Sequence, residues 1–384
     1  MNCLTINLDA FLHNFKVINK WMSQHDASWT VVTKVLCGNV DVMNALRHLG
    51  VTSLGDSRLS NMKTAKDLFP EYEGWYLRVP GPSVIDEVVA LSSVSLNSEI
   101  ETIVSLEKTA SKLDKTHNII IMIELGDLRE GILPGSLVKF YKSVFNLPHI
   151  RILGIGANLG CLAGVAPNVD QLMQLVLYRE LLELKFQHKL PLISAGSSAT
   201  LPLLLEGRVP AGINHFRIGE ALFLGTDLIN GGILPDLRDD VMLLHAEIAE
   251  LKEKMLAPPA ETTTIAPFAS EQPDLSEELS PGQRGYRALV GVGQLDTDIN
   301  GLTPINSNYQ IAGASSDITV VNIGDDPGGL KVGDTIKFRP NYAALLRLMN
   351  SRYITKFVEP SLDIFEKEIR KKYPKLKSAS NILF

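Results

Sequence analysis

Short apolar runs and longer amphipathic stretches alternate along residues 28–225 of this 384-residue chain. The short runs are rich in β-branched residues and end at polar or glycine positions, which is typical of buried strands. Between them, apolar positions recur at helical spacing, as in residues 169–189, where charged side chains take the opposite face. Eight strands are expected, at residues 28–35, 51–57, 74–80, 94–97, 118–124, 151–158, 191–196 and 215–220. Eight βα repeats predict a (β/α)8 barrel of the TIM type rather than an open doubly wound sheet.

The pattern changes after about residue 230. Alternating, strand-like segments separated by glycine and aspartate turns are found at residues 245–254, 287–295, 309–323 and 331–338. We therefore expect an α/β chain with a barrel over residues 1–228. A C-terminal β domain should follow over residues 229–384, ending in a charged amphipathic helix at 361–372. The proline-rich residues 256–285 are expected to form a long loop.

Composition narrows the function to small-molecule chemistry. Hydrophobic residues make up 45% and charged residues 21% of the chain, and the net charge of -6 argues against a nucleic-acid partner. The sequence shows neither a signal peptide nor an apolar stretch long enough to cross a membrane, so a cytoplasmic protein is expected. The three cysteines, Cys3, Cys37 and Cys161, lack metal-ligand spacing and fit reduced thiols. No metal site is predicted.

Lys34 is the first candidate for chemistry. It ends the first predicted strand, and the C-terminal ends of barrel strands face the active site. A buried lysine costs desolvation energy unless it has a partner or loses its charge, and condensation with the aldehyde of pyridoxal phosphate removes the charge. A strand-end lysine that reaches solvent is the alternative.

Other polar residues end later strands of the predicted barrel. They are Arg129, Asn158, Ser197, Ser198 and Arg217. The segments SAGSSAT and RIGEALFLG offer hydroxyls and helix-start amides of the kind that bind phosphate. The two serines can equally be helix N-caps. GIGANLG misses the spacing of a dinucleotide loop, and DTDING, at residues 296–301, lacks the final glutamate of a calcium loop.

Several stretches together resemble the alanine-racemase-like pyridoxal-phosphate enzymes, and within them the ornithine racemases. The matching stretches are VVTKVLCGN, SLNSE, IELGDLREGILP, GIGANLGCLAG, FRIGEALFLG, AEIAELKEK, GQLDTDINGL, GASSD and NYAALLRLM. They cover nearly all of the chain up to about residue 353. Each stretch alone is common, whereas the combination is specific.

The resemblance implies a cofactor-binding barrel whose active site is completed by the β domain of a second subunit in a head-to-tail homodimer. Lys34 would form the Schiff base with pyridoxal 5'-phosphate and act as one of two catalytic bases. Arg129 would contact the cofactor and the substrate carboxylate. Asp317, in GASSD, matches the aspartate of the loop that enters the partner's site.

The remaining cofactor contacts follow from the same resemblance. Ser198 and the amides of Gly219 and Glu220 would bind the phosphate, with Ser197 and Asn158 in the same site. Arg217 would donate to the pyridine nitrogen. A guanidinium keeps its proton, so the cofactor ring would be a weak electron sink, which suits a racemase better than a decarboxylase.

The sequence also departs from the alanine racemases. Asn158 replaces a histidine, and Gln294 stands near the position of an entrance tyrosine. The second base is unassigned, with Tyr342, Cys37 and Cys161 as candidates. A terminal ammonium on the substrate would need an anionic partner, for which Asp296, Asp298 and Asp317 are candidates.

The predicted function is therefore racemisation of ornithine by two-base proton transfer at Cα. Racemisation of lysine, arginine or alanine is one alternative. A pyridoxal-phosphate carrier without catalytic activity is the other.

Overall fold

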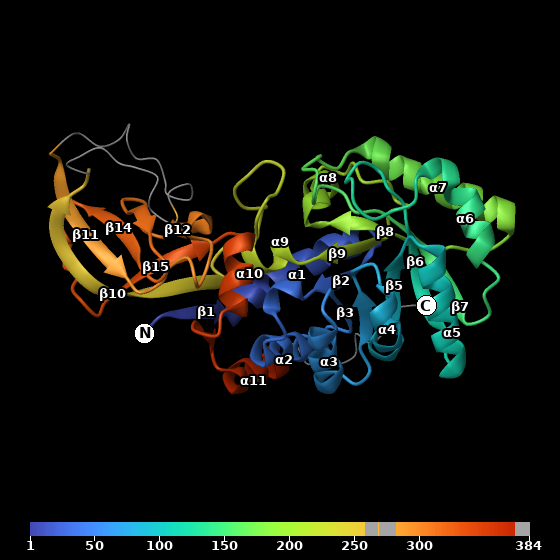
Figure 1. Ribbon diagram of the computed structural model, residues 1–384, viewed down its shortest axis with the longest axis horizontal. Coiled ribbons are helices and arrows are strands. Elements are labelled where there is room, and N and C mark those ends of the chain that lie inside the picture. The colour runs from blue at the N-terminus through green and yellow to red at the C-terminus, as the bar shows by residue number, and fades with distance from the viewer. Residues whose placement is uncertain (258–267, 269–281, 373–384) are drawn as a thin grey trace. The chain divides into compact units, whose positions relative to one another are not determined.

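The computed structural model describes residues 1–257, 268 and 282–372. The chain divides into two compact units, both drawn in Figure 1. One unit comprises Leu12–Arg238 and the C-terminal helix, and the other comprises Met1–Phe11 and Asp239–Ser361. Most of the predicted loop at residues 256–285 lies outside the described residues.

Eight parallel strands close into a barrel in chain order. They are β2 (Ser28–Val32), β3 (Ser53–Asp56), β4 (Glu73–Tyr76), β5 (Val94–Asn97), β6 (His117–Met122), β7 (Ile150–Gly156), β8 (Leu192–Ser197) and β9 (His215–Ile218). Pairing of β2 with β9 closes the ring. Each strand overlaps one of the eight predicted runs, so the predicted barrel is confirmed.

Helices follow the barrel strands and cover the outside of the ring (Figure 1). They are α2 (Val40–His48), α3 (Leu59–Leu68), α4 (Ile85–Leu91), α5 (Ile100–Lys112), α6 (Leu137–Val144), α7 (Val169–Phe186), α8 (Leu201–Leu205) and α9 (Glu220–Leu224). α1 (Leu8–Gln24) precedes the first barrel strand. The predicted helix at 169–189 begins as expected, with a capping box between Asn168 and Gln171, but ends three residues earlier because Gln187 adopts a left-handed conformation.

The barrel wall depends on two glycines. A Cβ on Gly154 would lie 1.8 Å from the carbonyl oxygen of Leu192 on the neighbouring strand. A Cβ on Gly196 would lie 2.0 Å from the ring of Phe216. A side chain at position 154 would therefore overlap the backbone of the neighbouring strand, and one at position 196 would overlap the Phe216 side chain.

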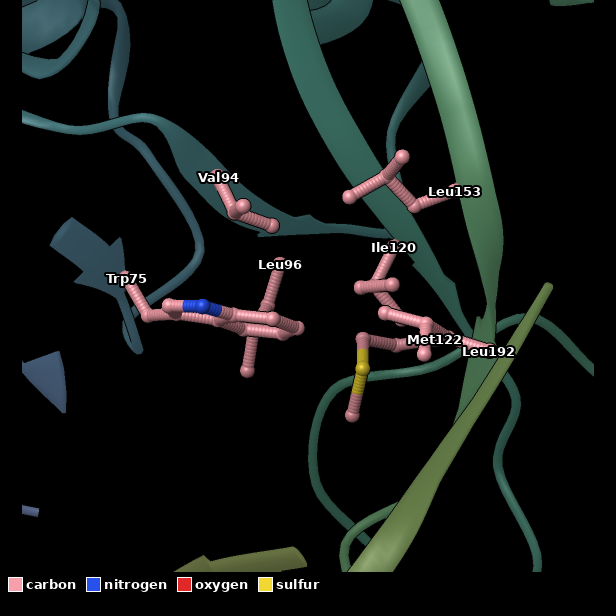
Figure 2. Close-up of a cluster of buried hydrophobic side chains, with 7 residues drawn as sticks. All are labelled: Trp75, Val94, Leu96, Ile120, Met122, Leu153 and Leu192. Atoms are coloured by element: carbon pink, nitrogen blue, oxygen red, sulfur yellow. The ribbon is translucent and has the colours of Figure 1, made fainter. Parts of the chain in front are cut away.

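The inside of the barrel has an apolar half and a polar half. Figure 2 shows the apolar half, a buried cluster drawn from five successive strands: Trp75, Val94, Leu96, Ile120, Met122, Leu153 and Leu192. Buried hydroxyls from β8, β2 and β3 and the imidazole of His215 on β9 form the polar half. The ring of His215 stacks on Trp75 with centroids 4.3 Å apart, which joins the two halves across the ring.

The second unit is built on one eight-stranded sheet. Its strands are β1 (Cys3–Asn7), β10 (Met242–Met255), β11 (Arg284–Val290), β12 (Leu302–Pro304), β13 (Gln310–Ala314), β14 (Thr319–Gly324), β15 (Thr335–Pro340) and β16 (Thr355–Glu359). All pairs are antiparallel except β1 with β16. This confirms the predicted C-terminal β domain, which also holds helix α10 (Tyr342–Asn350).

A single boundary after residue 228 does not describe the two units. β1 lies in the β sheet, because Leu4 and Ile6 are fully buried there between β10 and β16. Helix α11 (Leu362–Lys372) packs on α2 of the barrel unit, where Phe365 and Ile369 are buried. The predicted helix exists, but its apolar face covers the barrel instead of the β domain.

Candidate active site

Lys34 opens a short 3-10 turn directly after β2, at the C-terminal end of the barrel. Burial lowers the pKa of its ammonium. The neighbouring Cys161 opposes this shift, and the positive charge of Arg129 adds to it. Asp56 and Arg217 act more weakly, Asp56 against the shift and Arg217 with it. The amine is therefore held nearer to its neutral, nucleophilic form than a solvated lysine would be.

A buried carboxylate fixes the turn that carries Lys34. The Thr33 hydroxyl donates to Asp56 at 2.9 Å. The amide of Arg58 and the side chain of Asn61 also donate to Asp56, at 2.9 and 3.2 Å. Asp56 is 3% exposed, and burial raises the pKa of its carboxyl group despite these bonds. The position of Lys34 is thus tied to the end of β3.

Arg129 lies on the loop after β6. The carboxylate of Glu124 shapes this loop by accepting hydrogen bonds from the backbone amides of Gly126, Leu128 and Arg129. The Nε atom of Arg129 lies 2.8 Å from Glu130 and 3.3 Å from Asp127. Among the contacts of the described residues, both terminal Nη groups of Arg129 remain without an acceptor.

Arg217 lies on β9 and points into the barrel, where it is 8% exposed. Its Nη1 donates to the carbonyl and the hydroxyl of Ser194. Its Nη2 donates to the carbonyl of Ala157 at 3.0 Å and to the side-chain oxygen of Asn158 at 2.8 Å. Burial lowers the pKa of Arg217 to about 10, so the guanidinium stays charged at neutral pH.

The two arginines offer opposite parts of the guanidinium. Arg129 is held through Nε and presents two Nη groups, which match the two oxygens of a carboxylate. Arg217 is held through both Nη groups, and its Nε–H is the one donor with no acceptor among the described residues. A single N–H fits an acceptor with one lone pair, such as a pyridine nitrogen.

Glu130, a residue that the sequence analysis did not single out, connects these arginines. Its Oε2 faces Arg129, and its Oε1 accepts from the side-chain amide of Asn158. Asn158 in turn accepts from Arg217. The only sequence clue is an acid directly after Arg129 in GDLREG, which is normally a solvated charge.

Buried neutral groups continue the network behind Arg217. The Ser194 hydroxyl is 2.8 Å from Nδ1 of His215, whose Nε2 is 3.1 Å from Thr30. Thr30 is 2.8 Å from the hydroxyl of Ser53. Burial lowers the pKa of His215 to about 3, so its imidazole is neutral at physiological pH.

The two predicted phosphate-binding serines differ in their contacts. Ser197 caps a short 3-10 turn, as the N-cap alternative predicts. The buried hydroxyl of Ser198 accepts from the amide of Ala221 at 3.1 Å, which brings it to the start of α9. Gly219 and Glu220 begin that helix, and burial raises the pKa of Glu220 to about 7.

The remaining candidates fall into two groups. Asp296, Asp298, Asp317 and Tyr342 all belong to the β unit. There, Asp296 accepts from a turn amide, Asp298 lies 4.0 Å from an arginine, and the exposed Asp317 accepts from a serine hydroxyl. In the barrel unit, Cys37 adopts a left-handed conformation three residues after Lys34, and its thiol lies 3.9 Å from the Lys34 carbonyl.

The described part of the chain contains neither a membrane-spanning helix nor a metal-binding cluster of side chains. None of its helices combines the length and the apolar character needed to cross a membrane. No group of three or more histidine, cysteine, aspartate or glutamate side chains there is arranged to hold a metal ion.

Comparison with known proteins identifies the family. The chain is 36% identical to an ornithine racemase of Acetoanaerobium sticklandii over 92% of this chain and 98% of that protein. It is 32% identical to a lysine racemase of Thermotoga maritima over 94% of this chain and 99% of that protein.

Solved structures and family descriptions agree with these relatives. The fold resembles an alanine racemase of Streptomyces lavendulae with a TM-score of 0.70 and 15% identity, covering 95% of this chain and 98% of that one. Residues 6–227 match the family described as the alanine racemase N-terminal domain. The chain belongs to the alanine racemase family and is an amino-acid racemase.

Proposed function

We propose that the protein interconverts L- and D-ornithine with pyridoxal phosphate as cofactor. The family is pyridoxal-phosphate-dependent, and the two curated relatives named above are racemases of ornithine and of lysine. The observation that carries the proposal is the arrangement around Lys34. A lysine of lowered pKa has, as electrostatic neighbours, one arginine that offers two terminal nitrogens and one that offers a single N–H.

The donor set fits pyridoxal phosphate. The chemistry that this cofactor supplies when bound is withdrawal of electrons from the substrate Cα, through a link to an amine. Lys34 would hold the aldehyde end. The Nε–H of Arg217 would meet the ring nitrogen, and the hydroxyl of Ser198 with the first amides of α9 would hold the phosphate. Asn158 and Ser197 support these groups through the hydrogen bonds described above.

The chain's own residues would manage the proton and the substrate. Lys34 moves a proton at the substrate Cα, for which its lowered pKa is required. Arg217 donates a hydrogen bond without giving up its proton, because its pKa of about 10 remains well above neutral. Arg217 would thereby leave the ring nitrogen of a bound cofactor unprotonated, which would favour return of the proton to Cα over other reactions.

The carboxylate of the amino acid would bind to Arg129. Its two free Nη groups form a fork that matches a carboxylate in two parallel hydrogen bonds. This contact would fix the Cα hydrogen relative to Lys34. Asp296, Asp298 and Asp317 stay candidates for the terminal ammonium of ornithine.

The second base and the assembly also belong to the proposal. Tyr342, Cys37 and Cys161 stay candidates for the second base, and Cys161 has the electrostatic contact with Lys34 described above. We further propose a head-to-tail homodimer in which the β unit of the partner completes the site.

Hydrogen exchange at Cα tests this function. The purified protein, loaded with pyridoxal phosphate, is incubated with L-ornithine in deuterated water, and deuterium at Cα and optical rotation are followed. We expect both to change, with a higher kcat/KM for ornithine than for lysine, arginine or alanine. Lys34→Ala should abolish both signals, whereas Lys142→Ala, on the exposed surface, should retain them.

Three other outcomes of the same assay decide between the alternatives. Absence of exchange with all four amino acids would exclude these four as substrates. Cofactor binding without any exchange would favour a carrier. A higher kcat/KM for lysine would transfer the proposal to that substrate, as the Thermotoga maritima relative suggests.

A further inference from the structure

One carboxylate lies between the two arginines of the site. Glu130 is 15% exposed, and each of its oxygens has a different partner. One oxygen is 2.8 Å from Nε of Arg129 and the other accepts from Nδ2 of Asn158. The path continues from Oδ1 of Asn158 to Nη2 of Arg217 at 2.8 Å. An ion pair and two hydrogen bonds thus connect the loop after β6 to the inside of the barrel.

The neighbouring Asp127 cannot substitute for Glu130. Its Oδ1 accepts the backbone amides of Cys161 and Leu162, at 2.9 and 2.8 Å. Its buried Oδ2 lies 3.3 Å from Nε of Arg129 but makes no hydrogen bond there. Asp127 therefore holds the loop at 161–162, and the shorter ion pair with Arg129 comes from Glu130.

We propose that Glu130 is a positioning residue that fixes Arg129 and Arg217 relative to each other. The inference rests on the proposed function, in which Arg129 binds the substrate carboxylate and Arg217 the cofactor ring. By occupying Nε of Arg129, Glu130 turns the two Nη groups toward the substrate. Through Asn158 it also holds Nη2 of Arg217, which leaves Nε as the donor toward the cofactor.

The order of donors and acceptors along this path is fixed. Arg129 and Arg217 can only donate, so the atoms that face them must be acceptors. Asn158 must therefore direct its oxygen to Arg217 and its NH2 to Glu130, and both oxygens of Glu130 must accept. Glu130→Gln breaks this order, because glutamine has one acceptor oxygen and one NH2 where two acceptors are needed. Whichever way the two amides are turned, one N–H group along the path then faces another N–H group.

Exchanging the acid and the amide between positions 130 and 158 restores the order. In Glu130→Gln with Asn158→Asp, the glutamine oxygen accepts from Arg129 and its NH2 donates to the aspartate, which accepts from Arg217. The net charge of the pair is unchanged. Asn158→Asp alone instead brings two carboxylates together. The double variant should therefore recover what each single variant loses.

The experiment measures the two arginines separately, in the full-length protein. The dissociation constant of the apoprotein for pyridoxal phosphate and the absorbance of the bound cofactor report on Arg217. The ratio of kcat/KM for ornithine to that for ornithine α-amide, which lacks the carboxylate, reports on Arg129. Loss of a buried charged hydrogen bond predicts that Glu130→Gln and Asn158→Asp each weaken cofactor binding and lower this ratio by about 10- to 100-fold.

The control is Glu107→Gln, which removes a carboxylate bonded to His149 elsewhere in the barrel unit and should change neither readout. If Glu130 only stabilised the fold, its substitution would lower kcat/KM equally for ornithine and for ornithine α-amide, and the ratio of the two would not change. The inference is wrong if Glu130→Gln has the wild-type cofactor affinity and the wild-type kcat/KM ratio. It is also wrong if the double variant recovers neither value relative to the single variants. If Glu130→Gln fails to fold, recovery of both readouts in the double variant supports the inference, and an impaired double variant overturns it.

The proposed function can fail independently of this inference. A wild-type protein that binds pyridoxal phosphate but does not exchange the Cα hydrogen of ornithine would refute the proposed function. The dissociation constants of the single and double variants would then still decide whether Glu130 positions Arg217.

Discussion

Replacing Glu220 by glutamine should stabilise the apoprotein at alkaline pH. None of the hydrogen bonds and ion pairs of the described residues involves the Glu220 carboxyl group, and burial raises its pKa from the ordinary 4.5 to about 7. Between these values the unfolded chain loses this proton while the folded chain retains it. The contribution of Glu220 to the unfolding free energy is therefore fully present below pH 4.5 and is lost as the pH rises through 7.

The magnitude follows from the shift. A rise in pKa of this size corresponds to about 3 kcal/mol of unfolding free energy, because each unit is about 1.4 kcal/mol. Glu220 keeps some contact with solvent, which reduces the expected effect to about 2 kcal/mol. Glu220→Gln cannot ionise, so it should match the wild type at pH 4.5 and exceed its unfolding free energy by this amount at pH 8.

Urea unfolding of the apoprotein at pH 4.5 and pH 8 measures this difference. The matched control is Glu206→Gln, an exposed carboxylate paired with Arg208, which should change stability little at either pH. An equal difference between Glu220→Gln and wild type at both pH values would refute the reasoning, since an uncharged effect of the substitution has no pH dependence. A less stable variant at pH 8 would show that the Glu220 anion is stabilised.

Three further outcomes follow from other buried contacts. Gly154→Ala should prevent formation of a stable barrel, since its Cβ would lie 1.8 Å from a carbonyl oxygen of β8; soluble yield and circular dichroism measure this. Asp127→Ala should cost about 1–3 kcal/mol of unfolding free energy and increase hydrogen exchange at the amide of Cys161, because two hydrogen bonds to its carboxylate are lost. Burial depresses the pKa of His215 from 6.5 to about 3. Its contribution to the unfolding free energy is therefore fully present above pH 6.5 and is lost as the pH falls toward 3. His215→Phe should keep the stacking on Trp75 but lose this acid dependence, which acid unfolding curves would show.

The barrel could be predicted from the sequence because its strands are continuous apolar runs. Each run lies between two helical repeats, and the period of the repeat fixes the number of strands. The end of a strand is then known to within a few residues, which is why Lys34 and Arg217 could be selected. Both occupy positions where an apolar strand has no need of charge.

Contacts between segments far apart in the chain could not be predicted. β1 pairs with residues about 240 positions later, and nothing in the five residues CLTIN identifies that partner. The charged helix α11 has only a narrow buried face, Phe365 and Ile369, and its pattern does not say which surface that face covers. Glu130 was missed for the same reason, since its role depends on Asn158, which follows it by 28 residues.

The contacts of Arg129 and Arg217 explain why lysine could not replace either arginine. Arg217 makes four hydrogen bonds through its terminal nitrogens, to Ser194 on β8 and to Ala157 and Asn158 directly after β7, and still has a donor left. An ammonium has three donors on one atom, so a lysine there would use all of them on these groups and offer nothing further. Arg129 is held at Nε, so its two terminal nitrogens can donate two parallel hydrogen bonds. A flexible ammonium cannot reproduce this geometry. Conservative replacement by lysine would therefore keep the charge at both positions and still remove the directed donors on which the proposed recognition depends.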